Sequence, residues 1–251
     1  MKSIFDRSTN RLTLHLRNNE RVRELTFDEA KANAEKGLYG YYVVHGYNKP
    51  EIDDVRQRKT LGLYDENRKR NLPTSPMFFL CGYKFPKSFI ERGLTHLVGK
   101  DNPQEVEQMF GENRSVAGLR GPFPKTENLE FSDAHNSIEN VNAIAHRAYQ
   151  EKARVVYLTS KNHVERLRYI AKVFFEGSDN LEHMDIVGVN TPADTKWNGF
   201  YEKYIALPTT KLLLFGLRGS SPDTIMREYN KRRYNPILKA VGKLVRSHYG
   251  K

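Results

Sequence analysis

The chain has 251 residues, and its 41 lysines and arginines exceed its 30 acidic residues, which gives a formal net charge of +11. This length allows a hydrophobic core to form without disulfides, and the single cysteine, Cys81, excludes both an intramolecular disulfide framework and a zinc site built from several cysteines. The charged amino-terminal stretch has no apolar segment typical of a secretory signal, and no run approaches the roughly 20 apolar residues of a membrane helix. We therefore expect a soluble, cytoplasmic protein with no membrane partner.

The first half of the chain alternates helical patterns with short apolar runs. Thr26 is placed to cap a first helix that Gly37 ends, and the aromatic and β-branched run that follows is too short for a helix, which favours a buried strand. A second apolar run, after two prolines, favours another buried strand. In chain order we predict a helix over 27–36, a strand over 40–46, a helix over 53–70, a strand over 77–82, a helix and a short strand over 85–97, and a helix over 102–109.

The second half repeats this alternation. We predict a helix over 137–150, a strand over 154–160, a helix over 162–176 and a strand over 184–189. The predicted fold class is therefore α/β, with a mostly parallel Rossmann-like sheet and helices on both faces in three α/β/α layers. We assign residues 1–39 to a polar amino-terminal segment and helix, residues 40–217 to the α/β domain, and residues 218–251 to a basic carboxyl-terminal segment packed on or extending from that domain. In such sheets, ligands bind at the carboxyl ends of the strands.

The richest strand end has the sequence Thr159-Ser160-Lys161-Asn162-His163-Val164-Glu165-Arg166. Thr159 and Ser160 can cap the following helix, whose first N–H groups lack intrahelical partners and carry a partial positive charge. His163 and Arg166 are three residues apart on one helix face, so a phosphate or carboxylate can meet backbone donors, an imidazole and a guanidinium together. This turn predicts an anion site, although an ordinary helix cap with a surface histidine and arginine has the same pattern.

Polar residues also crowd the start of the helix predicted from Ser137. Asn136 or Ser137 can cap this helix, while Glu139 and Asn140 on its first turn can face a ligand. The Glu139 carboxylate would then accept hydrogen bonds from ligand hydroxyls or act as a general base. A capped helix with a stabilising acidic first turn explains the same residues. The acidic residue and histidine just before this helix lack the partner spacing of a metal site, so we predict no bound metal.

Two earlier strand ends carry weaker signals. Gly46 and Gly82 close the first two predicted strands and permit a close approach of backbone to ligand, and Arg56 on the intervening helix can close the site. Cys81 is either a buried cysteine or a nucleophile. No G-x-G-x-x-G or P-loop pattern is present, which removes the main support for an ordinary dinucleotide or P-loop site.

Taken in order, these residues resemble the YdcF/SanA-like family, the domain of unknown function 218. The resemblance covers about residues 40–176, and its most specific parts are the last two motifs. The matching text is His45-Gly46, Arg56 with Leu63-Tyr64, Leu80-Cys81-Gly82, Glu105-Val106, Asn136-Ser137-Ile138-Glu139-Asn140 and the turn Thr159–Arg166. The chain departs from the family where Cys81-Gly82-Tyr83 replaces Ser-Gly-Gly, Ser137 replaces threonine and Val106 replaces alanine.

The resemblance implies a Rossmann-like domain whose relatives are associated with envelope biology and with nucleotide-like ligands. We therefore expect this protein to bind a small anionic ligand at the strand ends, either phosphorylated, a nucleotide, or similar to S-adenosylmethionine. His163 and Glu139 are the candidates for proton transfer, and whether a reaction occurs stays open. The predicted ligand-binding residues are Thr159, Ser160, Arg166, Asn136, Ser137, Asn140, Arg56, Gly46 and Gly82.

The basic carboxyl-terminal segment supports an alternative function. Residues 218–251 contain nine lysines and arginines and two acidic residues. Such a segment attracts polyanions, so binding of nucleic acid, or assembly, through residues 218–251 is the alternative prediction. A solvated basic helix face has the same composition.

Overall fold

The structure is a computed structural model, and it describes residues 21–45, 50–68, 77–81, 129–132, 134, 136–151, 153–175 and 183–234. The elements predicted over 85–97 and 102–109 lie outside these residues, as do Gly46 and Gly82.

The described strands form one sheet of six, all parallel, in the order β1-β6-β5-β2-β3-β4. Their bounds are β1 Val22–Leu25, β2 Tyr41–His45, β3 Met77–Cys81, β4 Leu129–Ser132, β5 Val155–Ser160 and β6 Met184–Val189. This arrangement confirms the predicted parallel α/β class. The edge strands β1 and β4 were not predicted, because four residues that include charged side chains carry too little apolar pattern to stand out.

The strand order places a topological switch point between β2 and β5. From β2 the chain moves outward through β3 to β4, and it then returns to the other side of β2 to form β5 and β6. Connections leave neighbouring strands in opposite directions at this point, which is where open α/β sheets bind ligands at the carboxyl ends of their strands. His45 and Ser160 are the last residues of the two strands concerned.

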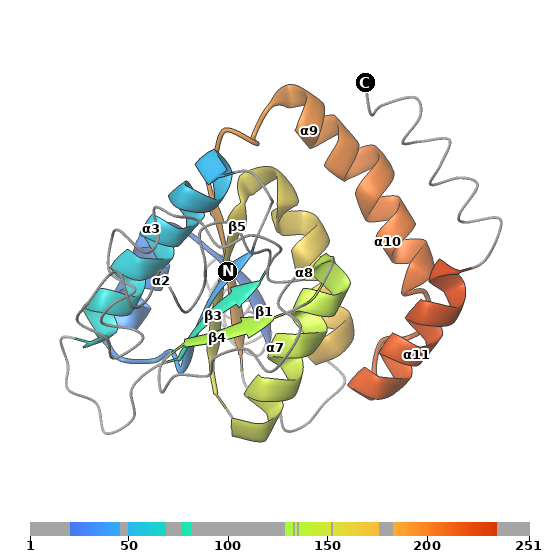
Figure 1. The fold of residues 1–251 in the computed structure, drawn as a ribbon, viewed down its shortest axis with the longest axis horizontal. Coiled ribbons are helices and arrows are strands. Elements are labelled where there is room, and N and C mark those ends of the chain that lie inside the picture. The colour runs from blue at the N-terminus through green and yellow to red at the C-terminus, as the bar shows by residue number, and fades with distance from the viewer. Residues whose placement is uncertain are drawn as a thin grey trace, which may run out of the picture.

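Helices cover both faces of the sheet (Figure 1). Helices α2 (Phe27–Glu35) and α3 (Pro50–Arg68) pack on one face, and α7 (Ser137–Glu151) and α8 (Val164–Phe175) pack on the other. Side chains alternate along each strand, so Tyr157 belongs to the apolar core beneath α7 and α8. Its neighbour Leu158 belongs to the core beneath α2 and α3. Both faces of the sheet are therefore buried, which explains the continuous apolar runs in the sequence.

The first helix confirms the capping expected from the sequence. Thr26 Oγ1 accepts the backbone N–H of Glu29 at 3.3 Å, and the Glu29 carboxylate accepts the backbone N–H of Thr26 at 2.8 Å. This reciprocal pair is a capping box, which sets the start of α2 at Phe27. Gly37, with a φ of 70°, follows the helix in the left-handed conformation that favours glycine.

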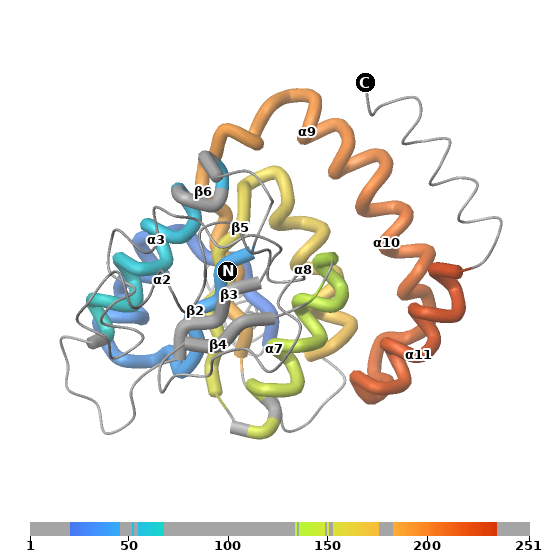
Figure 2. Tube along the Cα trace, in the orientation of Figure 1, coloured from blue at the N-terminus to red at the C-terminus, as the bar shows by residue number. Residues whose placement is uncertain are grey.

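A long helical segment follows the sheet and leads away from it (Figures 1 and 2). Helix α9 (Lys196–Tyr201), a π-helical turn (Glu202–Ala206) and α10 (Leu207–Leu213) follow one another directly. Helix α11 (Pro222–Arg233) then packs against α7 through Ile225 and Tyr229. No helix of the described residues is long and apolar enough to cross a membrane.

The basic end of α11 makes contacts within the chain. Arg232 donates to the carbonyl oxygens of Leu213 and Phe215, at 3.1 and 2.7 Å, while Lys231 lies 2.9 Å from the carboxylate of Glu228. These basic side chains therefore satisfy neighbouring carbonyl and carboxylate groups. Residues 235–251 lie outside the described part of the chain, and nucleic-acid binding through residues 218–251 stays a prediction.

Candidate functional site

A buried polar cluster lies at the switch point of the sheet. His45 ends β2 and its Nδ1 lies 2.8 Å from the hydroxyl of Tyr157 on β5, on the face covered by α7 and α8. The ring of His163, from the turn after β5, lies 4.7 Å from the ring of His45, centroid to centroid. Both imidazoles are buried. Two histidines from the strand ends singled out in the sequence therefore lie side by side at the carboxyl edge of the sheet.

Arg56 reaches this cluster from α3 on the opposite face. Its side chain is 1% exposed, and it donates from Nη1 to the backbone oxygen of His45 at 2.6 Å. Nε and Nη2 donate to Oγ of Ser160 at 3.2 and 2.5 Å, and this hydroxyl also lies 2.6 Å from Oγ1 of Thr191. A single guanidinium thus connects the ends of β2 and β5, and the binding of a ligand by Arg56 stays a prediction.

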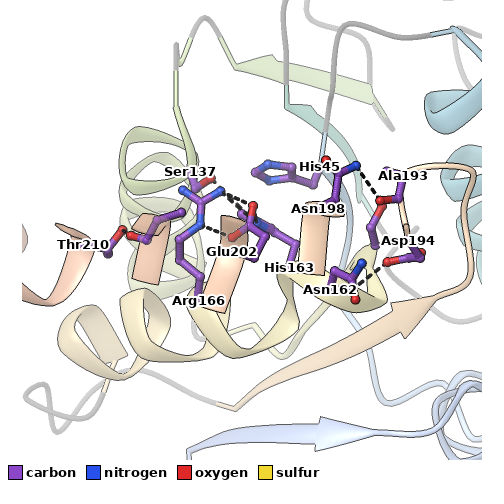
Figure 3. A network of polar contacts seen from close by, with 12 residues as sticks. His45, Ser137, Asn162, His163, Arg166, Ala193, Asp194, Asn198, Glu202 and Thr210 are labelled. Atoms are coloured by element: carbon purple, nitrogen blue, oxygen red, sulfur yellow. Dashed lines mark hydrogen bonds and ion pairs between the residues drawn. The ribbon is translucent and has the colours of Figure 1, made fainter. Parts of the chain in front are cut away.

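Arg166, His163 and Glu202 form the second part of the cluster (Figure 3). Arg166 and Glu202 make a paired contact in which Nε lies 2.7 Å from Oε2 and Nη2 lies 3.0 Å from Oε1. His163 Nδ1 lies 3.2 Å from Glu202 Oε1 and 2.9 Å from Arg166 Nη2. Glu202 begins the π-helical turn, a type of irregular helix that is frequent at functional sites.

Ser137 contacts the other side of the His163 ring. Its Oγ lies 3.2 Å from Nε2 of His163. Ser137 is the first residue of α7, and Asn136 caps this helix, because its Oδ1 accepts the backbone N–H groups of Ile138 and Glu139 at 3.0 and 3.1 Å. The helix start at Ser137 and the turn Thr159–Arg166, both singled out in the sequence, are therefore in direct contact. We refer to His45, Arg56, Ser137, Ser160, His163, Arg166 and Glu202 as the switch-point cluster.

Burial and the nearby guanidinium groups keep both imidazoles neutral near pH 7. Burial, followed by the charges of His163, Arg56 and Arg166, holds the pKa of His45 well below its usual range. Burial and the charge of Arg166 lower the pKa of His163 to about 4, although Glu202 opposes that shift. Burial on its own would raise the pKa of Glu202, but the hydrogen bond from His163 and the charge of Arg166 lower it to about 2.

The structure corrects one expectation about the turn after β5. The Ser160 side chain makes no capping hydrogen bond, and Oγ1 of Thr159 is buried without a hydrogen-bond partner. Instead, the carboxylate of Asp194 accepts the backbone N–H of Asn162 at 2.7 Å and that of Thr191 at 2.7 Å. A charged acceptor from the loop after β6 therefore occupies the position that the sequence assigned to a hydroxyl, and it complements the partial positive charge of the helix start.

The other predicted residues lie around this cluster or outside the described residues. Asn140 is buried, and its Oδ1 has no hydrogen-bond partner in the described part of the chain. Glu139 accepts a hydrogen bond from Arg233 of α11 at 2.7 Å, so its predicted role in proton transfer competes with an ion pair. The backbone of Cys81 ends β3, while Gly46 and Gly82 fall outside the described residues. Within the described ranges, no group of three or more histidine, cysteine or acidic side chains is arranged to hold a metal ion.

Sequence reasoning missed Glu202, Asp194 and Thr191. Thr191 and Asp194 lie just after β6, so extending the strand-end rule to this fourth loop would have found them. Glu202 carried no comparable signal, because it is 36 residues from Arg166 and lies within a helix of its own.

No family model matches the chain, and neither a curated protein nor a solved structure matches it. The fold and the site define a parallel α/β protein with a buried polar cluster at the switch point of its sheet. The likeness to the YdcF/SanA-like family stays a prediction.

Proposed function

We propose that the protein binds a small ligand through an anionic group, a phosphate or a carboxylate, at the switch-point cluster. The observation that carries this proposal is the convergence of Arg56, Arg166 and the neutral imidazoles of His45 and His163 at the carboxyl ends of β2 and β5. Guanidinium groups match the geometry of phosphate and carboxylate oxygens, and neutral imidazoles can donate to them.

The electrostatics of the cluster support an anion. The charges of Arg56 and Arg166 both lower the pKa of His45, so the potential that these residues create at its ring is positive. An anion placed beside this ring would be stabilised by the same charges, and it would in turn raise the pKa of both imidazoles. Binding should therefore be accompanied by proton uptake below neutral pH.

Unsatisfied polar atoms in the same region also support a ligand. Within the described part of the chain, Oδ1 of Asn140 and Oγ1 of Thr159 are buried and have no hydrogen-bond partner. Buried polar atoms are nearly always paired, so an unpaired one calls for a specific reason, such as a ligand or a catalytic role. An acceptor amide and a hydroxyl suit the hydroxyl groups of a ribose or sugar attached to the anionic group. Nucleotides and sugar phosphates combine such hydroxyls with an anionic phosphate. S-adenosylmethionine likewise combines ribose hydroxyls with a carboxylate.

A thermal-shift measurement tests the proposal directly. We expect inorganic phosphate, a nucleotide, a sugar phosphate or S-adenosylmethionine to raise the melting temperature in a concentration-dependent way; a ligand at 100 times its Kd stabilises the folded state by about 2.7 kcal/mol. The variant Arg166→Met should lose most of this shift. The matched control is Arg23→Met, because the Arg23 side chain is 25% exposed, close to the 22% of Arg166, and it pairs with Asp185 instead.

Two results would contradict this assignment. One is the absence of stabilisation by every compound tested. The other is an equal ligand shift in Arg166→Met and Arg23→Met, which would place the bound anion elsewhere on this basic protein.

A further inference from the structure

We propose that Ser137, His163 and Glu202 form a nucleophile, a general base and an orienting acid for acyl transfer from a carboxylic ester that carries an anionic group. Ser137 Oγ lies 3.2 Å from Nε2 of His163, and Nδ1 of the same ring lies 3.2 Å from Oε1 of Glu202. A hydroxyl and a carboxylate on opposite nitrogens of one imidazole are the arrangement by which enzymes activate a serine.

The three residues come from separate elements that meet at the switch point. Ser137 begins α7, His163 ends the short helical turn after β5, and Glu202 begins the π-helical turn after α9. All three side chains are largely shielded from water: Ser137 and His163 are 6% and 5% exposed, and the Glu202 side chain is 14% exposed. Such shielding strengthens the electrostatic interaction between a developing imidazolium and its carboxylate.

The tautomer of His163 decides the role of Ser137. A proton on Nδ1 is donated to Glu202 and leaves Nε2 free to accept the proton of Ser137, whereas a proton on Nε2 is donated to Ser137 and lets Nδ1 accept from Arg166. The proposed relay uses the first tautomer. An anionic group beside Arg166 favours this tautomer, because the anion accepts the hydrogen bond that the guanidinium would otherwise donate to Nδ1.

Asn136 supplies a candidate donor for the oxyanion. Its Oδ1 accepts two backbone N–H groups of α7, which fixes the orientation of the amide, and its buried Nδ2 has no hydrogen-bond partner among the residues that the structure describes. This unpaired donor belongs to the residue directly before Ser137. An amide donor from a side chain is one of the ways in which acyl-transfer enzymes stabilise the negative charge of a tetrahedral intermediate.

The proposed reaction uses no oxidant or added group other than water. Ser137 Oγ forms a bond to the ester carbon while its proton moves to His163 Nε2, and the carbon–alcohol oxygen bond then breaks as His163 returns that proton to the departing alcohol. Water adds to the acyl carbon and loses a proton to His163. The bond to Ser137 Oγ breaks, and Oγ takes the proton back, so that a carboxylic acid is released and the site is restored.

This inference rests on the proposed function, because the anionic group of the ester is the part held beside Arg56 and Arg166. The test is reaction of the full chain with a fluorophosphonate probe, followed by mapping of the modified residue by mass spectrometry. We expect modification of Ser137. Glu202→Gln and His163→Gln should slow the modification roughly 1,000-fold, as loss of a partner does in comparable arrangements. Ser221→Ala, which removes an exposed serine that caps α11, should leave the rate unchanged.

Two variants distinguish a catalytic role of Asn136 and Ser137 from a structural one. Asn136→Asp keeps the oxygen that caps α7 but removes the amide donor, so it should retain the melting temperature and slow the hydrolysis of mono-p-nitrophenyl succinate, an ester that carries a carboxylate, about 100-fold. Ser137→Cys should react with iodoacetamide at residue 137 faster than the same variant carrying His163→Gln. Each variant is compared at the same folded fraction, measured by circular dichroism.

The outcomes separate the two proposals. No modification of Ser137 while phosphate still stabilises the protein overturns the acyl-transfer inference and leaves the anion site intact. Modification of Ser137 that is unaffected by His163→Gln and Glu202→Gln, or modification of Ser160 instead, also overturns it. Modification that depends on both partners supports the relay. If this modification occurs and none of the anionic compounds stabilises the protein, the anion site is overturned while the relay stands.

Discussion

The sheet carries a buried polar cluster at each end, and the two differ in composition. At the amino end, the fully buried carboxylate of Asp185 on β6 accepts hydrogen bonds from Arg23, Arg154 and the hydroxyl of Tyr39 at 2.8 to 3.3 Å, and we call these residues the amino-end cluster. At the carboxyl end, the switch-point cluster also contains the buried, neutral imidazoles of His45 and His163.

This difference in composition is what we expect of a structural cluster and a ligand site. In the amino-end cluster, opposite charges compensate one another and link β1, β6 and the starts of β2 and β5, and burial together with the Asp185 charge raises the pKa of Tyr39 so that it stays a donor. In the switch-point cluster, burial and the nearby guanidinium groups lower the pKa of two imidazoles that could donate to a ligand. Groups with shifted pKa values are common at sites of binding and catalysis, which is the role we propose for this cluster.

The largest effect should come from breaking the amino-end cluster. Asp185→Asn keeps the size of the side chain but removes the charge that compensates Arg23 and Arg154, and loss of one partner from a buried pair typically lowers the free energy of unfolding by about 3–5 kcal/mol. Urea denaturation measures this loss. Asp223→Asn is the control, because its side chain is 90% exposed, and we expect a change within roughly 0.5 kcal/mol. Equal stabilities of the two variants would contradict the structural role of Asp185.

The next largest effect should be a decrease in stability at low pH that arises in the switch-point cluster. In the unfolded chain, His163 takes up a proton as the pH falls through its ordinary pKa of 6.5, whereas in the folded state the pKa is lowered to about 4. The unfolded state therefore binds more protons between these values, and stability should decrease by roughly 3 kcal/mol as the pH falls from 6.5 to 4, with no further loss from this group below pH 4. Melting temperatures measured from pH 8 to 4 test this.

The matched variant for the pH prediction is His163→Gln, which should melt with a shallower dependence on pH over that window. His45, whose pKa is also lowered, remains in this variant and retains part of the slope. An unchanged slope would show that His163 does not titrate as its surroundings require.

The smallest effect should come from the cap of the turn after β5. Asp194→Ala removes the carboxylate that accepts the backbone N–H groups of Asn162 and Thr191, and loss of such a cap costs about 1 kcal/mol. Because Thr191 also contacts Ser160, we expect ligand stabilisation to decrease in this variant as well. Thr26→Ala, which removes the cap of α2, should cost a similar amount without affecting the ligand shift. A greater loss of ligand stabilisation in Thr26→Ala would contradict this link.

Much of this architecture could be predicted from local sequence, because periodicity and capping act within a few residues. The apolar runs that end at His45 and Ser160 identified β2 and β5, and the stripe after Ser137 identified α7, since burial on both faces of a sheet or on one face of a helix leaves a regular pattern. The rule that ligands bind at strand ends then singles out His163 and Arg166 from the sequence.

Only the tertiary structure decided the partners of those residues. Local sequence placed His163 at a strand end, but its contacts with Ser137 and Glu202 arise because α7, α8 and the helix after β6 meet at one edge of the sheet. Hydrogen bonds between side chains 26 and 39 residues apart depend on strand order and helix packing, which no local pattern encodes. By itself the sequence determined which residue types lie at the carboxyl edge of the sheet, and the packing of distant elements decided which of them contact one another.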